Sequence, residues 1–65
     1  METTKRILLE CRYLISLNKS YYDLAKIFNV SVDTIKFDIN IRLKDIDQEL
    51  FYRVKDNIAK NNLVN

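Results

Sequence analysis

The chain of 65 residues contains neither glycine nor proline. Its turns therefore have to be built from asparagine, aspartate and serine, of which asparagine best tolerates a left-handed backbone. No segment sustains the alternation of apolar and polar residues that a strand would show, and apolar residues instead recur at three- and four-residue spacing. The sequence predicts an all-α fold, a four-helix compact domain formed by residues 1–65.

Polar residues that favour helix starts divide the chain into four amphipathic stretches. Ser20 precedes Asp23 at the spacing of a capping box, and Ser31 and Asp47 are further N-cap candidates. Asn29 stands where the chain must turn in a left-handed conformation. The expected helices cover about residues 4–17, 21–28, 32–43 and 48–60, and the tail at 61–65 is expected to fray.

The stretch YDLAKIFNVSVDTIKFD, at Tyr22–Asp38, joins two of these helices through a tight turn. Leu24 and Phe28 are expected to face inward from the first helix, and Ile35 from the second. Ala25 is small enough to let the two helices cross closely. This is the frame of a helix-turn-helix, in which the second helix enters the major groove of DNA.

The net charge of +2, from 11 basic against 9 acidic side chains, is mild for a nucleic-acid-binding protein. The whole surplus lies in residues 1–19, so any positive face must draw on the first helix and the turn after it. No apolar run approaches the roughly 20 residues that span a bilayer, and no signal peptide is visible. We therefore expect a cytoplasmic protein that makes no contact with a membrane.

Metal binding and catalysis are not expected. The chain has no histidine, which excludes a zinc site on ligand count, and its lone Cys11 has no partner for an internal disulfide. Cys11 lies at helical spacing from Ile7 and Leu14, which favours a buried core position over a reactive thiol. A small helical domain also leaves little room for a sheltered cleft. We expect no enzymatic activity, no cofactor and no small-molecule substrate.

The run LNKSYYDLAKIFNVSVDTIKFDINIRLKDIDQELFYRVK resembles the sporulation stage III protein D family of bacterial transcriptional regulators. The resemblance implies a small DNA-binding regulator of sporulation with its recognition helix in the major groove. Its more specific part is the continuation beyond the helix-turn-helix. The positions that match the family are Tyr13, Lys19, Ala25, Lys26, Phe28, Val30, Ser31, Thr34, Asp38, Arg42, Leu43, Ile46, Leu50, Val54 and Lys55.

Three departures from the family pattern bear on DNA binding. The family has basic residues near the positions of Val32 and Phe37, and glycine where this chain has Asn29. It also has a basic extension after the helix that corresponds to Gln48–Lys60. If that extension contacts phosphates in the family, this chain is expected to bind more weakly or to pair with a second copy, so a homodimer stays open.

Six side chains on the outer side of the third helix are candidate base readers. Asn40 can pair bidentately with adenine, Lys36 can reach guanine or a phosphate, and Thr34 can touch a thymine methyl group. Asp33 repels phosphate unless it accepts from cytosine, and a plain solvated helix face is the alternative interpretation. The candidates are Val32, Asp33, Thr34, Lys36, Phe37 and Asn40.

Phosphate contacts are expected around the starts of the second and third helices, where hydroxyl groups and free backbone amides come together. One tyrosine of the adjacent pair at the start of the second helix is expected to be packed against the core instead. The candidates are Lys19, Ser20, Tyr21, Tyr22 and Ser31.

Phe37 and Ile41 are large apolar residues one helical turn apart at the edge of the same face. They extend the core beneath the last helix, form a protein interface, or, in the case of Phe37, pack against thymine methyl groups. Asp38 is expected to pair with a nearby cation such as Arg42, four residues further on.

The leading interpretation is a sequence-specific transcriptional regulator that reads double-stranded DNA with the helix at 32–43. The alternative is a protein-protein interaction module that kept the helix-turn-helix fold with weak or no DNA binding. The operator, the sign of regulation and the oligomeric state stay open.

Overall fold

The structure, a computed structural model, describes residues 2–61. In this range the chain folds into helices joined by short turns, without a strand, which confirms the all-α prediction. The elements are α1 (Thr3–Leu17), α2 (Tyr21–Phe28), α3 (Val32–Phe37), the π-helical turn η1 (Asp38–Arg42), α4 (Leu43–Ile46) and α5 (Gln48–Asn61). The expectation that the tail frays falls mostly outside the described residues.

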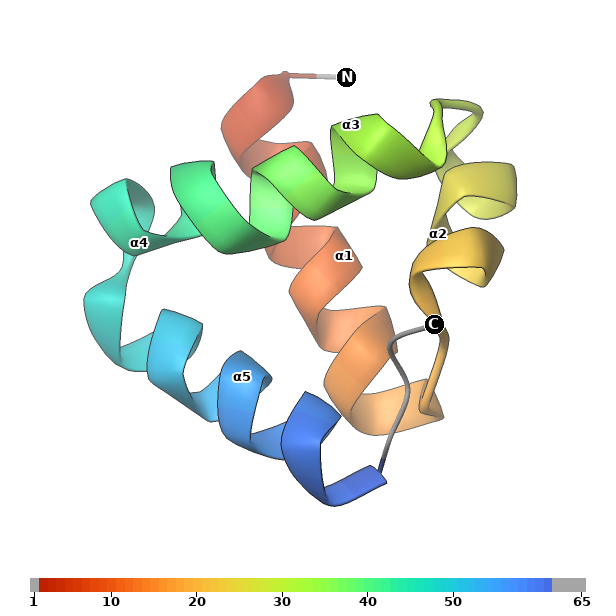
Figure 1. Ribbon diagram of the computed structural model, residues 1–65. Coiled ribbons are helices and arrows are strands. Elements are labelled where there is room, and N and C mark those ends of the chain that lie inside the picture. Colours follow the sequence, from red (N-terminus) through yellow and green to blue (C-terminus); the bar gives the residue numbers. More distant parts are fainter. Residues whose placement is uncertain (1, 62–65) are drawn as a thin grey trace.

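The elements α3, η1 and α4 form one continuous long third helix, because the backbone keeps right-handed helical angles across both junctions. Figure 1 shows α1 in the middle of the molecule, with the long third helix crossing its N-terminal half and α2 and α5 on either side. Helix α1 contacts all of these neighbours. None of the described helices is both long and apolar enough to cross a membrane.

The third helix is longer than the sequence predicted, since it ends at Ile46 and not near Leu43. Asp47 ends it by adopting extended angles, φ −156° and ψ 98°, and its carboxylate then accepts from the backbone N–H of Leu50 at 3.0 Å. The predicted cap at Asp47 is thereby confirmed. The preceding Asp45 remains helical, so a single aspartate makes the break.

Within the third helix, η1 is one wide turn in which the Leu43 N–H donates to the carbonyl of Asp38, five residues back. In an α-helix each four-residue step overshoots a full turn by about 40°, so Leu43 would lie about 80° away from Ile35. The wide turn takes up part of this drift. Ile35, Ile39 and Leu43 are all fully buried as a result.

The turns are built as the sequence predicted. The Ser20 hydroxyl accepts from the Asp23 N–H at 3.2 Å while the Asp23 carboxylate accepts from the Ser20 N–H at 3.1 Å, which makes a complete capping box. The Ser31 hydroxyl accepts from the Thr34 N–H at 3.1 Å. Asn29 is left-handed at φ 56°, as expected for the chain reversal.

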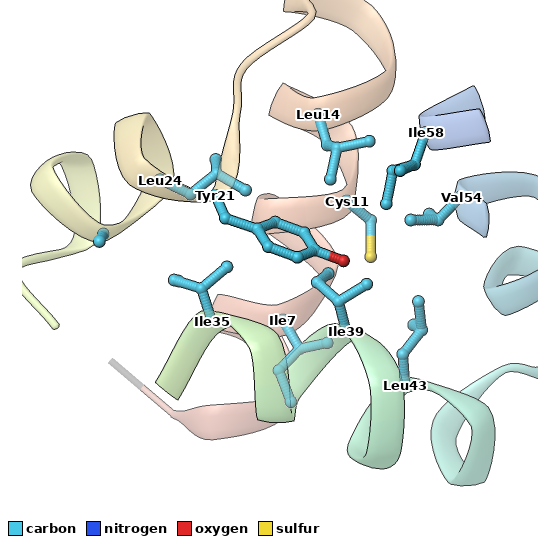
Figure 2. Close-up of a cluster of buried hydrophobic side chains, with 11 residues drawn as sticks. Ile7, Cys11, Leu14, Tyr21, Leu24, Ile35, Ile39, Leu43, Val54 and Ile58 are labelled. Carbon is cyan, nitrogen blue, oxygen red and sulfur yellow. The ribbon is translucent and has the colours of Figure 1, made fainter. Parts of the chain in front are cut away.

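The core contains side chains from α1, α2, the long third helix and α5. Figure 2 shows these side chains converging on the ring of Tyr21. Cys11 lies in this cluster as predicted, and its burial raises the pKa of the thiol to about 12, so it stays protonated at neutral pH. The buried apolar residues are Ile7, Cys11, Leu14, Tyr21, Leu24, Ala25, Ile35, Ile39, Leu43, Val54 and Ile58.

We expect Asn29→Val to destabilise the protein by about 1–2 kcal/mol, because a β-branched side chain clashes with the left-handed backbone at this position. Urea unfolding followed by circular dichroism measures the change. Asn29→Gly is the matched control and should cost no stability, because glycine adopts positive φ freely. A valine variant as stable as the parent would show that this backbone angle carries no constraint.

Candidate nucleic-acid interface

Helices α2 and α3 meet at a tight corner, which is consistent with the predicted helix-turn-helix. The chain turns at Asn29, whose N–H donates to the carbonyls at the end of α2. The Val30 N–H then donates to the Ala25 carbonyl at 3.0 Å, which closes the last turn. Helix α3 starts immediately afterwards at its Ser31 cap, so the corner holds the two helices in fixed relative positions.

The outward side of the long third helix carries Asp33, Phe37 and Ile41, all exposed to solvent. Phe37 is 48% exposed and Ile41 54% exposed, which rules out the alternative in which they extend the core beneath the last helix. Of the remaining base-reading candidates, Val32, Thr34, Lys36 and Asn40 are half-buried.

Two of these half-buried side chains are already engaged within the protein. The Thr34 hydroxyl lies 2.9 Å from the Ser31 hydroxyl, in a hydrogen bond that reinforces the cap of α3. The Asn40 amide nitrogen donates to the Lys36 carbonyl at 2.8 Å, and the Asn40 amide oxygen accepts from the Lys55 ammonium group of α5. Bidentate pairing of Asn40 with adenine would have to use its second N–H and the second lone pair of its oxygen while these bonds hold the side chain in place.

The candidates for phosphate contacts also differ in how far their side chains are exposed. Tyr21 is only 3% exposed, and its hydroxyl points into the core, whereas Tyr22 is 46% exposed. This settles which tyrosine of the pair is packed, and it leaves Tyr22 as the hydroxyl available at the surface. Lys19 and Ser20 are half-buried and Ser31 is exposed.

The start of α2 already holds an anion. Hydrogen bonds from the backbone and side chain of Ser20 lower the pKa of the Asp23 carboxyl, which keeps it ionised. Because this carboxylate occupies the region where a phosphate would approach, it competes with any phosphate contact at the α2 N-terminus.

A buried carboxyl pair, Glu10 and Asp38, lies between α1 and the long third helix. Arg6 bridges the two: its Nε donates to Glu10 Oε2 at 3.2 Å and its Nη2 donates to Asp38 Oδ2 at 2.9 Å and Oδ1 at 3.2 Å. Arg42 donates to Asp38 Oδ1 at 3.1 Å, which confirms the predicted pair. The carboxyl pair and the two arginines tie the wide turn η1 to α1.

The pKa of Glu10 is raised to about 8, mainly by burial of the carboxyl group and further by the hydrogen bond and charge of neighbouring Asp38. Arg6 acts in the opposite direction without cancelling the shift. Glu10 Oε1 is buried with no hydrogen-bond donor among the described residues, which also favours the neutral form. Glu10 therefore carries a proton at neutral pH.

Sequence reasoning missed Arg6 and Glu10, although a signal was present. Glu10 is three residues after Ile7 and four before Leu14, so it falls on the apolar stripe of α1. A carboxylate on such a stripe needs a cation within reach, and Arg6 lies four residues before it.

Two cations lie where the long third helix meets α5: Lys44 belongs to the long third helix and Lys55 to α5. The Lys44 and Lys55 ammonium groups are each 5.9 Å from the centre of the Phe51 ring. Both lysines are exposed, and Lys55 also contacts Asn40. These lysines add positive charge at the C-terminal part of the candidate reading helix.

Comparison with curated proteins and with solved structures gave no match. The family model described as Stage III sporulation protein D matches residues 2–64, which is nearly the whole chain. This match confirms the resemblance found in the sequence and extends it back to the start of α1. The chain belongs to the stage III sporulation protein D family.

Proposed function

We propose that this protein is a sequence-specific transcriptional regulator of sporulation that binds double-stranded DNA in the bacterial cytoplasm. Family membership supports a sporulation-related DNA-binding role in general. The observation that carries the more specific proposal is the α2–α3 corner, which fixes α3 at its cap and leaves the side bearing Asp33, Phe37 and Ile41 open to solvent.

In this proposal the N-terminal part of the long third helix enters the major groove. Lys19 and Tyr22 contact the phosphate backbone near the start of α2, and Lys44 and Lys55 contact it on the α5 side. We further propose that the protein is not an enzyme and uses no cofactor. Residues 2–61 form no pocket that would shelter a small substrate.

The affinity of one subunit for DNA should depend only modestly on salt. The face holds few free cations, since Arg6 and Arg42 are paired with buried carboxyl groups. With about two to four phosphates neutralised, the logarithm of affinity should fall against the logarithm of salt concentration with a slope of roughly −2 to −4. Two copies on half-sites about one helical turn apart would give twice that slope.

Fluorescence anisotropy with duplexes selected by the protein from a random library tests this at several salt concentrations. Lys55→Ala should make the slope shallower by about one unit if Lys55 meets a phosphate. Lys60→Ala is the control on the same helix, because Lys60 is paired with Asp56 at 3.2 Å near the far end of α5. Failure to select any duplex at low salt would reject the proposed function.

The alternative, a protein-protein interaction module, is favoured by the exposed pair Phe37 and Ile41 together with the low net charge. The double change of both residues to lysine separates the two functions. It should abolish self-association or partner binding in an interaction module, whereas in a DNA-binding protein it should alter binding to selected duplexes.

A further inference from the structure

Several polar side chains of the long third helix are committed to bonds within the protein. Thr34 bonds to Ser31, and both polar atoms of the Asn40 amide have partners. Arg42 donates to buried Asp38 at 3.1 Å. These groups are therefore poorly placed to form direct hydrogen bonds with base edges.

Two of the side chains that remain free on this face, Phe37 and Ile41, are large and apolar, beside the charged Asp33 and Lys36. Phe37 and Ile41 are four residues apart, so they lie one above the other on the helix surface. The Arg42 guanidinium lies 4.9 Å from the centre of the Phe37 ring, and its bond to Asp38 holds it in place. Phe37 is thus supported on one side while about half of its surface stays open.

We propose that this face selects DNA by contacting the 5-methyl groups of thymines in the major groove, with Phe37 as the main contact and Ile41 as the second. The inference rests on the proposed function and names the base chemistry it would read. Thymine is the one base whose major-groove edge presents an apolar group.

Guanine–cytosine pairs fit the same face poorly. Their major-groove edges present only hydrogen-bond donors and acceptors, which would lose water against Phe37 and Ile41 without gaining partners. Asp33 is the exposed acceptor on this face, and the adenine opposite a thymine offers it an amino group. Asp33 can accept from the amino group of cytosine as well as from that of adenine, so the preference for adenine–thymine pairs rests on Phe37 and Ile41.

Two observations favour DNA over a protein as the partner that binds this face. The chain belongs to a DNA-binding family, and Phe37 lies in the second turn of the helix that follows the corner. A protein partner or a second copy of the chain on this face is an outcome that the following experiment detects.

The experiment replaces each thymine of a selected duplex in turn by deoxyuridine, which removes only the 5-methyl group. Anisotropy should show affinity falling roughly fourfold at one or more positions, the effect of losing one buried methyl contact. Phe37→Ala should weaken binding to the thymine duplex and remove most of the difference between thymine and uracil at those positions. Tyr52→Ala, at an exposed aromatic residue of α5, is the control that should keep that difference.

If uracil substitution changes the affinity at no position of a duplex that the parent protein binds, the inference is overturned and the proposed function still stands. The inference is equally overturned if Phe37→Ala abolishes self-association but preserves the thymine preference, since the face would then be a protein contact. If the parent protein binds no duplex at any salt concentration, both the inference and the proposed function are rejected.

Discussion

Arg6→Met should unfold most of the protein at neutral pH. Arg6 is the residue that contacts both members of the buried carboxyl pair, and without it Glu10 Oε2 loses its hydrogen-bond donor and buried Asp38 keeps only Arg42 among the described residues. Breaking a buried pair by removing one partner costs about 3–5 kcal/mol. A single core in a domain of this size rarely supplies more than about 3–5 kcal/mol, so the loss is comparable with the whole stability.

Urea and thermal unfolding at pH 7, followed by circular dichroism, measure the effect. Arg12→Met is the matched control, because Arg12 is an exposed arginine on the same helix. The control should stay within about 0.5 kcal/mol of the parent. Equal melting curves for the two variants would mean that the bridge between α1 and the third helix contributes nothing to stability.

The free energy of unfolding should fall as the pH rises from about 5 to 8. The pKa of Glu10 is about 8 in the folded protein and 4.5 as the ordinary value, so in this range the folded state binds a proton that the unfolded state has released. The stabilising contribution is complete below the unfolded pKa and is lost as the pH rises through the folded one. We expect a decrease of about 1 kcal/mol per pH unit.

Neither histidine nor Cys11 contributes to the pH dependence between pH 5 and 8. The chain has no histidine, and the raised pKa of Cys11 places its titration well above pH 8. Glu10→Gln, which imitates the protonated side chain, should flatten the profile between pH 5 and 8. Glu49→Gln, at an exposed position of α5, should leave it unchanged. A parent and a Glu10→Gln variant with the same profile would contradict the assigned protonation of Glu10.

The sequence predicted the features that depend on local chemistry. The caps at Ser20, Ser31 and Asp47 and the left-handed Asn29 involve atoms a few residues apart, so spacing alone identifies them. The end of the third helix was predicted too early, because aspartate favours a helix end and yet the backbone of Asp45 stays helical.

Features that depend on tertiary packing escaped prediction. The contact between Arg6 and Asp38 joins residues 32 positions apart, and nothing in the local sequence specifies it. The choice between Tyr21 and Tyr22 likewise depends on how α2 is rotated against the core. Asn40 had a free polar side chain in the sequence-based interpretation, whereas in the structure α5 supplies Lys55 as its partner.

The wide turn η1 has a consequence for how the chain length can vary. The span from Ile35 to Leu43 holds eight residue steps where two α-helical turns need about seven. The segment Asp38–Arg42 thus holds one residue more than a regular α-helix needs. Loss of that residue would turn the segment into regular α-helix, with Ile35 and Leu43 still facing α1. Removal of one residue from either flank of the turn would instead rotate one end of the helix by about 100°. Loss of a single residue from this helix is therefore tolerable at one place, the turn that holds Asp38 and Arg42, provided that these two residues are kept.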